Sequence, residues 1–114
     1  MSDCLFCKII NGDIPAKKIH ETPELLVFHD IAPKAPFHAL VIPKKHITSL
    51  NELTVDDEKL IGSLFTAAKK VAADGAFAEK GYRVVFNCGA DGGQTVGHLH
   101  MHLLGGRSLE WPPG

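Results

Sequence analysis

The chain has 114 residues, enough for one domain (residues 1–114) but not for two, and its 45% hydrophobic and 22% charged residues exclude a disordered or fibrous protein. With 12 Lys and Arg against 13 Asp and Glu the net charge is -1, which argues against a nucleic-acid polymer as partner but is compatible with a single nucleotide. The apolar stretches are far shorter than the roughly 20 residues that cross a membrane, and the first residues lack the pattern of a signal peptide. We therefore expect a cytoplasmic protein without a membrane partner.

Short elements separated by turn residues follow one another along the chain. A short helix or turn is predicted over residues 6–11, and a longer helix begins near Thr54, whose hydroxyl can cap the first turn, and ends at Asp74-Gly75. The apolar face of the long helix comprises Leu60, Ile61, Leu64, Phe65, Ala68, Val71 and Ala72. Runs of β-branched and aromatic residues predict strands at 17–21, 25–30, 37–42, 82–87 and 98–104.

Five short strands, one long helix and a short N-terminal helix predict an α+β domain with a five-stranded antiparallel meander sheet. One long helix covers only one face of such a sheet, which leaves apolar surface and open edge strands exposed. We therefore expect a homodimer in which the sheet continues from one subunit to the other.

Three of the seven histidines, His98, His100 and His102, alternate with apolar residues in the last predicted strand. Alternate side chains of a strand point to opposite faces, so the three imidazoles share one face, with neighbours about 6.6 Å apart along the strand. The residues between and after them then point into the core: Leu99, Met101 and Leu103.

Three explanations of the aligned histidines are open at this point. They can form a polar face without chemistry, or two of them at i and i+2 can bind one zinc ion. Alternatively, a neutral imidazole can attack phosphorus while its neighbour donates hydrogen bonds to the phosphate oxygens. The glycine-rich loop over residues 89–97 supplies backbone amides that can approach a phosphate, and strict alternation beside such a loop disfavours the first explanation.

The chain resembles the histidine triad family along nearly its whole length. Residues 98–104 have the family's pattern His-x-His-x-His-x-x, in which x is apolar, and further matches cover residues 6–10, 12–15, 28–33, 41–47, 81–83, 103–107 and 111–114. Together these segments look like the histidine triad nucleotide-binding branch of the family, the purine nucleoside phosphoramidate hydrolases.

The resemblance implies a role for each histidine of the site. His100 would attack the α-phosphorus and become transiently nucleotidylated, and His102 would contact a phosphate oxygen and stabilise the transition state. His98 would be structural, and His38 would be a relay that sets the protonation state of His100, although a histidine in an apolar strand is on its own typical of a hydrogen-bonded core residue. Thr95 completes the predicted catalytic group.

The resemblance also implies a nucleotide-binding pocket, in which the Asp30 carboxylate would accept hydrogen bonds from the ribose hydroxyls. The predicted set comprises Phe6, Ile9, Phe28, His29, Asp30, Ile31, Asn87, Gly93, Gln94, Thr95, His100, Met101 and His102. Taken alone, the apolar members are typical of a buried core, and Asp30 and Asn87 are typical of turns. Family members often have serine where Thr95 stands and tyrosine where Gly97 stands, which leaves substrate affinity and loop order open.

Cys4 and Cys7 form a C-x2-C pair, a spacing at which two thiolates can bind one zinc ion. Some similar family members complete a structural zinc site with two histidines, which here would be His46 and His98. The alternative is a pair of reduced, unligated thiols under the sheet, and both interpretations stay open. Cys88 has no partner in the sequence and is interpreted as a small buried hydrophobe.

The resemblance thus implies a purine nucleoside 5′-phosphoramidate hydrolase that forms a covalent nucleotidyl-histidine and needs no cofactor at the reacting centre. Its partners would be purine nucleoside monophosphates and phosphoramidates, and it would be a homodimer in which the C-terminal residues 111–114 reach the active site of the partner subunit. The alternatives are a hydrolase of dinucleoside polyphosphates or adenylylated intermediates and a nucleotide-binding scaffold protein.

Overall fold

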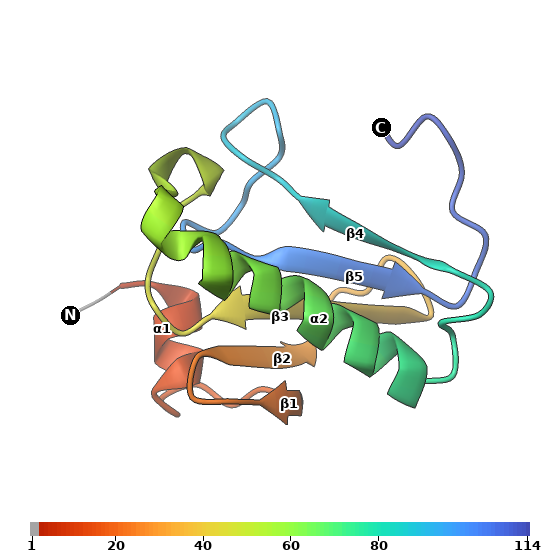
Figure 1. Ribbon diagram of the computed structural model, residues 1–114, viewed down its shortest axis with the longest axis horizontal. Helices are drawn as coiled ribbons and strands as arrows, with labels where there is room; N and C mark the ends of the chain where they lie inside the picture. Colours follow the sequence, from red (N-terminus) through yellow and green to blue (C-terminus); the bar gives the residue numbers. More distant parts are fainter. Residues whose placement is uncertain (1–2) are drawn as a thin grey trace.

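The computed structural model describes residues 3–114, which form four helical elements and one sheet (Figure 1). The helical elements are α1 (Leu5–Ile10), the 3-10 helices η1 (Leu50–Glu52) and η2 (Val55–Asp57), and α2 (Glu58–Asp74). The strands are β1 (Lys18–Glu21), β2 (Leu25–His29), β3 (Phe37–Pro43), β4 (Tyr82–Phe86) and β5 (Met101–Gly105). Over residues 3–114, no helix is both long and apolar enough to cross a membrane.

The sheet confirms the predicted α+β fold, with five antiparallel-paired strands, one long helix and a short N-terminal helix. The meander order is wrong in one detail, because the strands lie in the order β1-β2-β3-β5-β4. After β3 the chain passes through α2, which lies across one face of the sheet, and the segment between α2 and β4 then leads to the edge that β4 forms (Figure 1). β4 is therefore separated from β3 by one strand, and β5 returns between them as the antiparallel partner of both.

α2 covers one face of the sheet with small and apolar side chains. The sequence predicts Phe65 on this face, and its ring contacts Phe86 of the edge strand β4. Phe65 nevertheless remains 47% exposed, because no further strand lies beyond β4 to cover it. The buried helix residues and the sheet residues beneath them form one core cluster, which includes Leu64, Ala67, Ala68, Val71, Ala72, Val27, Ala39, Val41, Met101 and Leu103.

The opposite face of the sheet carries α1 and the candidate site. Leu40 of β3 pairs with Phe28 of β2 on one side and with His102 of β5 on the other. Directly paired residues point to the same face, so His102 belongs to the face that α1 covers. The core cluster on this face comprises Phe6, Ile9, Leu26, Phe28, Leu40 and Ile42.

The predicted cap at Thr54 begins a 3-10 turn that leads into α2. Thr54 Oγ1 accepts a hydrogen bond from the Asp56 amide at 3.3 Å, and Asp57 Oδ2 accepts one from the Thr54 amide at 3.0 Å. Asp57 Oδ1 also accepts a hydrogen bond from Lys45 Nζ at 2.8 Å, and the bonds from Lys45 and then from the Thr54 amide lower the pKa of Asp57. Because Lys45 follows β3, this contact ties the segment that contains His46 to the start of α2.

Truncation of Leu103 tests which face of β5 supports the core. Leu103 is 0% exposed under α2, so we expect Leu103→Ala to lower the free energy of unfolding by about 3 kcal/mol, through lost burial and a cavity. Leu104 points to the other face and is only half-buried, so Leu104→Ala should cost about 1 kcal/mol. Urea unfolding curves measure both values, and equal losses would contradict this division of the strand.

Candidate active site and metal centre

His98 and His100 precede the hydrogen-bonded part of β5, which begins at Met101 rather than at His98 as predicted. The chain bends at His98, and the amide of Leu99 donates to the carbonyl of Ile47 in the segment after β3 at 2.6 Å instead of joining the sheet. The predicted alternation nevertheless continues into this segment. The rings of His100 and His102 lie on the α1 face with their centroids 5.0 Å apart.

The central histidine has one ring nitrogen committed and one available. His100 Nδ1 donates to the carbonyl of His98 at 2.7 Å, because a carbonyl can only accept. In the neutral ring Nε2 therefore carries the lone pair. His100 is only 5% exposed, but its ring lines a cavity of about 250 Å³ that is open to solvent. A histidine with its lone pair on Nε2 thus lines a space that a small molecule can enter.

Most of the predicted binding residues meet in this cavity. Val96 and the segment 14–16, which folds back after α1, also line it, although the sequence analysis assigned them no role. The match of residues 12–15 to the family was the signal that could have identified part of this segment. The predicted residues that line the cavity are Phe6, Ile9, Phe28, His29, Asp30, Ile31, Thr95, His100 and His102.

The lining of the cavity includes a charged residue directly beside an exposed apolar one. Asp30 is half-buried there, whereas Ile31 beside it is 100% exposed. A second, wider hollow of about 620 Å³ shares Asp30 and Ile31 with the cavity and adds Lys17. The two hollows together offer an apolar wall for a ring system and charged groups for hydroxyl or phosphate groups.

Four predicted binding residues do not line the cavity, among the residues that the structure describes. Met101 is the clear correction, because its side chain is 0% exposed in the core under α2. Gln94 braces its own loop, since its amide donates to the carbonyls of Thr48 and Val96 and its oxygen accepts from the Gly89 amide. The other two are Asn87 and Gly93, whose binding role stays a prediction.

A chain of hydrogen bonds fixes the tautomers of two further histidines. The Lys34 amide donates to His38 Nδ1 at 3.0 Å, so the proton of neutral His38 is on Nε2. That nitrogen lies 2.9 Å from His102 Nδ1, which must accept. The proton of His102 is therefore on Nε2, and His102 is a hydrogen-bond donor in the wall of the cavity.

Burial keeps both of these histidines neutral near pH 7. It is the main cause that lowers the pKa of His102 to about 4, with further contributions from the neighbouring His100 and His38. Burial also lowers the pKa of His38, although the Asp30 carboxylate, whose Oδ2 is 3.4 Å from His38 Nε2, acts in the opposite direction. Both side chains therefore act as uncharged donors.

This geometry corrects the role expected for His38. Its ring contacts His102 rather than His100, so any effect on His100 passes through His102. A second proton on Nδ1 would face the Lys34 amide, which makes His38 a fixed donor rather than a relay.

Asp30, His38 and His102 lie close enough to one another to hold a metal ion. However, His38 Nε2 carries a proton and therefore has no lone pair with which to bind the metal.

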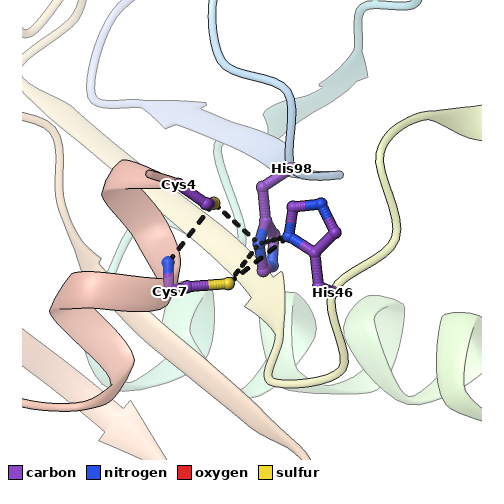
Figure 2. A group of neighbouring side chains, drawn as sticks. All are labelled: Cys4, Cys7, His46 and His98. Atoms are coloured by element: carbon purple, nitrogen blue, oxygen red, sulfur yellow. Dashed lines mark hydrogen bonds between the residues drawn. The ribbon is translucent and has the colours of Figure 1, made fainter. Parts of the chain in front are cut away.

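A second cluster of side chains lies at the end of the sheet, where α1 meets the segments after β3 and before β5. Figure 2 shows Cys4, Cys7, His46 and His98 pointing toward one another. His46 Nδ1 is 3.2 Å from His98 Nδ1 and 3.3 Å from Cys7 Sγ, and His98 Nδ1 is 3.4 Å from Cys4 Sγ and 3.7 Å from Cys7 Sγ. The four ligand atoms all lie within 4.8 Å of one another.

These distances fit a tetrahedral metal site. Zinc bonds of about 2.05 Å to nitrogen and 2.3 Å to sulfur place two nitrogens about 3.3 Å apart and a nitrogen and a sulfur about 3.5 Å apart. His98 Nε2 donates to the Pro43 carbonyl at 2.8 Å, which leaves Nδ1 with its lone pair toward the cluster. Burial, as the main cause, also lowers the pKa of His98 and keeps its ring neutral. The residues present therefore fit a Cys2His2 zinc ion.

Known proteins are similar to this chain in both sequence and fold. The chain matches the HIT domain over residues 11–109. An uncharacterized HIT-like protein of Synechococcus elongatus is 53% identical over 112 residues, which are 98% of this chain and 97% of the relative. The crystal structure of a HIT family hydrolase from Legionella pneumophila has a TM-score of 0.97 at 51% identity and covers 98% of this chain and 100% of that one. A histidine triad protein from Clostridium difficile has a TM-score of 0.93 at 44% identity, with 96% of each chain covered.

The chain therefore belongs to the histidine triad (HIT) family and has the fold of a HIT family hydrolase. The expected family is confirmed, and the three histidines at residues 98–102 are the feature after which the family is named.

Substitution of His38 distinguishes a fixed donor from a proton relay. The amide of glutamine can donate to His102 Nδ1 but does not ionise, so we expect His102 to keep its proton on Nε2 in His38→Gln and to lose this preference in His38→Ala. Imidazole nitrogen chemical shifts of His102 measure the tautomer. If Gln and Ala alter the shifts equally, His38 acts in another way than by donating this hydrogen bond.

Proposed function

We propose that this chain is a purine nucleoside 5′-phosphoramidate hydrolase that works through a covalent nucleotidyl-histidine at His100. The observation that carries this proposal is the 2.7 Å hydrogen bond from His100 Nδ1 to the His98 carbonyl, which leaves the lone pair on Nε2 in a residue that lines the cavity. The hydrolase fold of the family and the apolar cavity of about 250 Å³ support the same assignment. A nucleoside monophosphate is the product.

The first step of the proposed reaction forms a phosphorus–nitrogen bond. The lone pair of His100 Nε2 attacks the α-phosphorus, and the P–N bond of the substrate breaks with its electron pair on the departing nitrogen. This nitrogen takes up a proton from solvent and leaves as an amine. Nδ1–H of His100 stays bonded to the His98 carbonyl, which stabilises the positive charge on the nucleotidylated ring.

The second step restores the histidine. Water attacks phosphorus from the side that the amine has left, the bond from phosphorus to Nε2 breaks, and the water releases a proton to solvent. In both steps charge grows on the non-bridging phosphate oxygens. The neutral His102, with its proton on Nε2, donates a hydrogen bond to one of them without the cost of an additional buried charge.

The rest of the cavity accounts for binding. Phe6 and Phe28, with ring centroids 5.6 Å apart, form an apolar wall for a purine, and exposed Ile31 lies at its open side. Asp30 accepts hydrogen bonds from the ribose hydroxyls, and Thr95, which also lines the cavity, contributes its hydroxyl to the phosphate site. These roles follow the family resemblance at positions that line the cavity.

We also infer that the chain forms a homodimer through the edge strand β4. Phe65 beside this edge and Val55 nearby remain 47% and 76% exposed, as expected of surface that a second copy covers. The Arg83 guanidinium donates to the carbonyls of Leu109 and Glu110, which fixes the segment before the 81% exposed Trp111. This fixed segment supports our proposal that the C-terminal residues reach a partner subunit.

Replacement of the nucleophile tests the proposed reaction. We expect His100→Ala to lower the hydrolysis rate of an adenosine phosphoramidate by a factor of about a thousand or more, because the substitution removes the nitrogen that attacks phosphorus. His20 lies on the edge strand β1 outside this cavity, so His20→Ala is the matched control and should keep the wild-type rate. Product release is followed by chromatography of AMP.

The same assay contains the outcomes that contradict the proposal. Unchanged turnover in His100→Ala excludes the covalent mechanism. A wild-type rate on dinucleoside polyphosphates that far exceeds the rate on phosphoramidates assigns the chain to a different substrate class.

We further infer that Cys4, Cys7, His46 and His98 bind a structural zinc ion. Protein purified without added metal or chelator should contain about one zinc per chain by elemental analysis. Cys7→Ser should lose most of it because it removes a thiolate, whereas Cys88→Ser, outside the cluster, should retain it. A metal-free wild-type protein of equal thermal stability would exclude the zinc site.

A further inference from the structure

α1 contributes to the metal cluster and to the nucleotide cavity at once. Phe6 lies between Cys4 and Cys7 and is only 4% exposed. Its ring packs edge-on against His100, with centroids 5.1 Å apart, and against His98 at 5.9 Å. A shift of the two cysteines therefore moves a wall of the cavity and a neighbour of the nucleophile.

His98 connects the same two sites through its backbone. Its Nδ1 lies in the cluster, 3.2 Å from His46 Nδ1, while its carbonyl accepts the hydrogen bond from His100 Nδ1 at 2.7 Å. Rotation of this peptide would remove the acceptor that keeps the lone pair of His100 on Nε2. The orientation of the nucleophile thus depends on the placement of a residue whose side chain belongs to the cluster.

A third connection runs through the segment after β3. His46 contributes its ring to the cluster, and the carbonyl of the next residue, Ile47, accepts a hydrogen bond from the amide of Leu99 at 2.6 Å. Leu99 lies between the cluster residue and the nucleophile. Three segments that are distant in sequence therefore converge on four ligand atoms, and each of them also holds a part of the nucleotide site.

We propose that a metal ion bound by Cys4, Cys7, His46 and His98 increases the affinity of the cavity for nucleotide, and that bound nucleotide increases the affinity for the metal by the same factor. The metal joins the three segments and so reduces the conformational freedom that nucleotide binding would otherwise have to remove. This inference rests on the proposed nucleotide function. Phe6 and His98 are the positioning residues that transmit the effect.

The test measures the coupling from both sides. AMP binding to zinc-loaded and metal-free protein is measured by titration calorimetry, and we expect the dissociation constant to rise about tenfold on metal removal. Zinc affinity is then measured by competition with a chromophoric chelator, with and without saturating AMP. Linkage requires the same factor in this second measurement.

His46→Gln isolates the effect from the cavity. His46 is exposed and does not line the cavity, so the substitution removes a metal ligand without a direct contact to nucleotide. In the presence of limiting zinc, this variant should bind AMP as weakly as the metal-free wild type. In metal-free conditions the variant and the wild type should bind AMP equally. His20→Gln, outside the cluster, is the matched control and should behave as wild type with and without zinc.

Each result supports or overturns the proposal. The proposal is overturned if proteins with and without one bound zinc bind AMP with affinities that agree within twofold. It is also overturned if the chain binds AMP but takes up no zinc. In both cases the proposed nucleotide function stands. Absence of AMP binding in every form instead overturns the proposed function and this inference with it. If the metal-free chain loses its circular dichroism signal, the cobalt(II)-loaded protein is used, and a cobalt absorption spectrum that saturating AMP leaves unchanged overturns the coupling.

Discussion

The hydrogen bond from His100 Nδ1 to the carbonyl of His98 is the interaction on which the rest of the site depends. Imidazole in its neutral form has one lone pair, and this bond decides that it belongs to Nε2. The bond requires the bent backbone before β5, because a residue that is paired on both sides in the middle of a sheet would have its carbonyl in the ladder. The departure from the predicted strand is thus part of what makes the chemistry available.

The two faces of the sheet divide the requirements of stability and function. On one face, apolar side chains are buried under α2 and stabilise the fold, while the other face carries the histidines, α1 and the cavity. β5 contributes to both, with Met101 and Leu103 on the helix face and His102 on the other. Its place between β3 and β4 holds these side chains more rigidly than a place at the edge of the sheet would.

Local patterns in the sequence predict what depends on neighbouring residues, namely the element types, the alternation of the histidines and the cap at Thr54. Contacts between segments that are distant in the sequence could not be predicted from such local patterns. The placement of β5 inside the sheet follows from the path of α2, and the pairing of His38 with His102 follows from that placement. Gln94 shows the limit of residue type as a guide, because its amide suits a phosphate and the loop backbone equally well, and only the folded loop decides between them. The Cys2His2 cluster needed the family pattern, since spacing alone connects only Cys4 with Cys7.

The double use of β5 limits how its length can change during evolution. Deleting one residue between His100 and Gly105 would exchange the faces of every side chain beyond that point, so that histidine would meet α2 and leucine would meet the cavity. The turn over residues 89–93 carries no such constraint, because its side chains line neither the cavity nor the two core clusters. Insertions and deletions among related chains should therefore accumulate before the histidine segment and be absent within it.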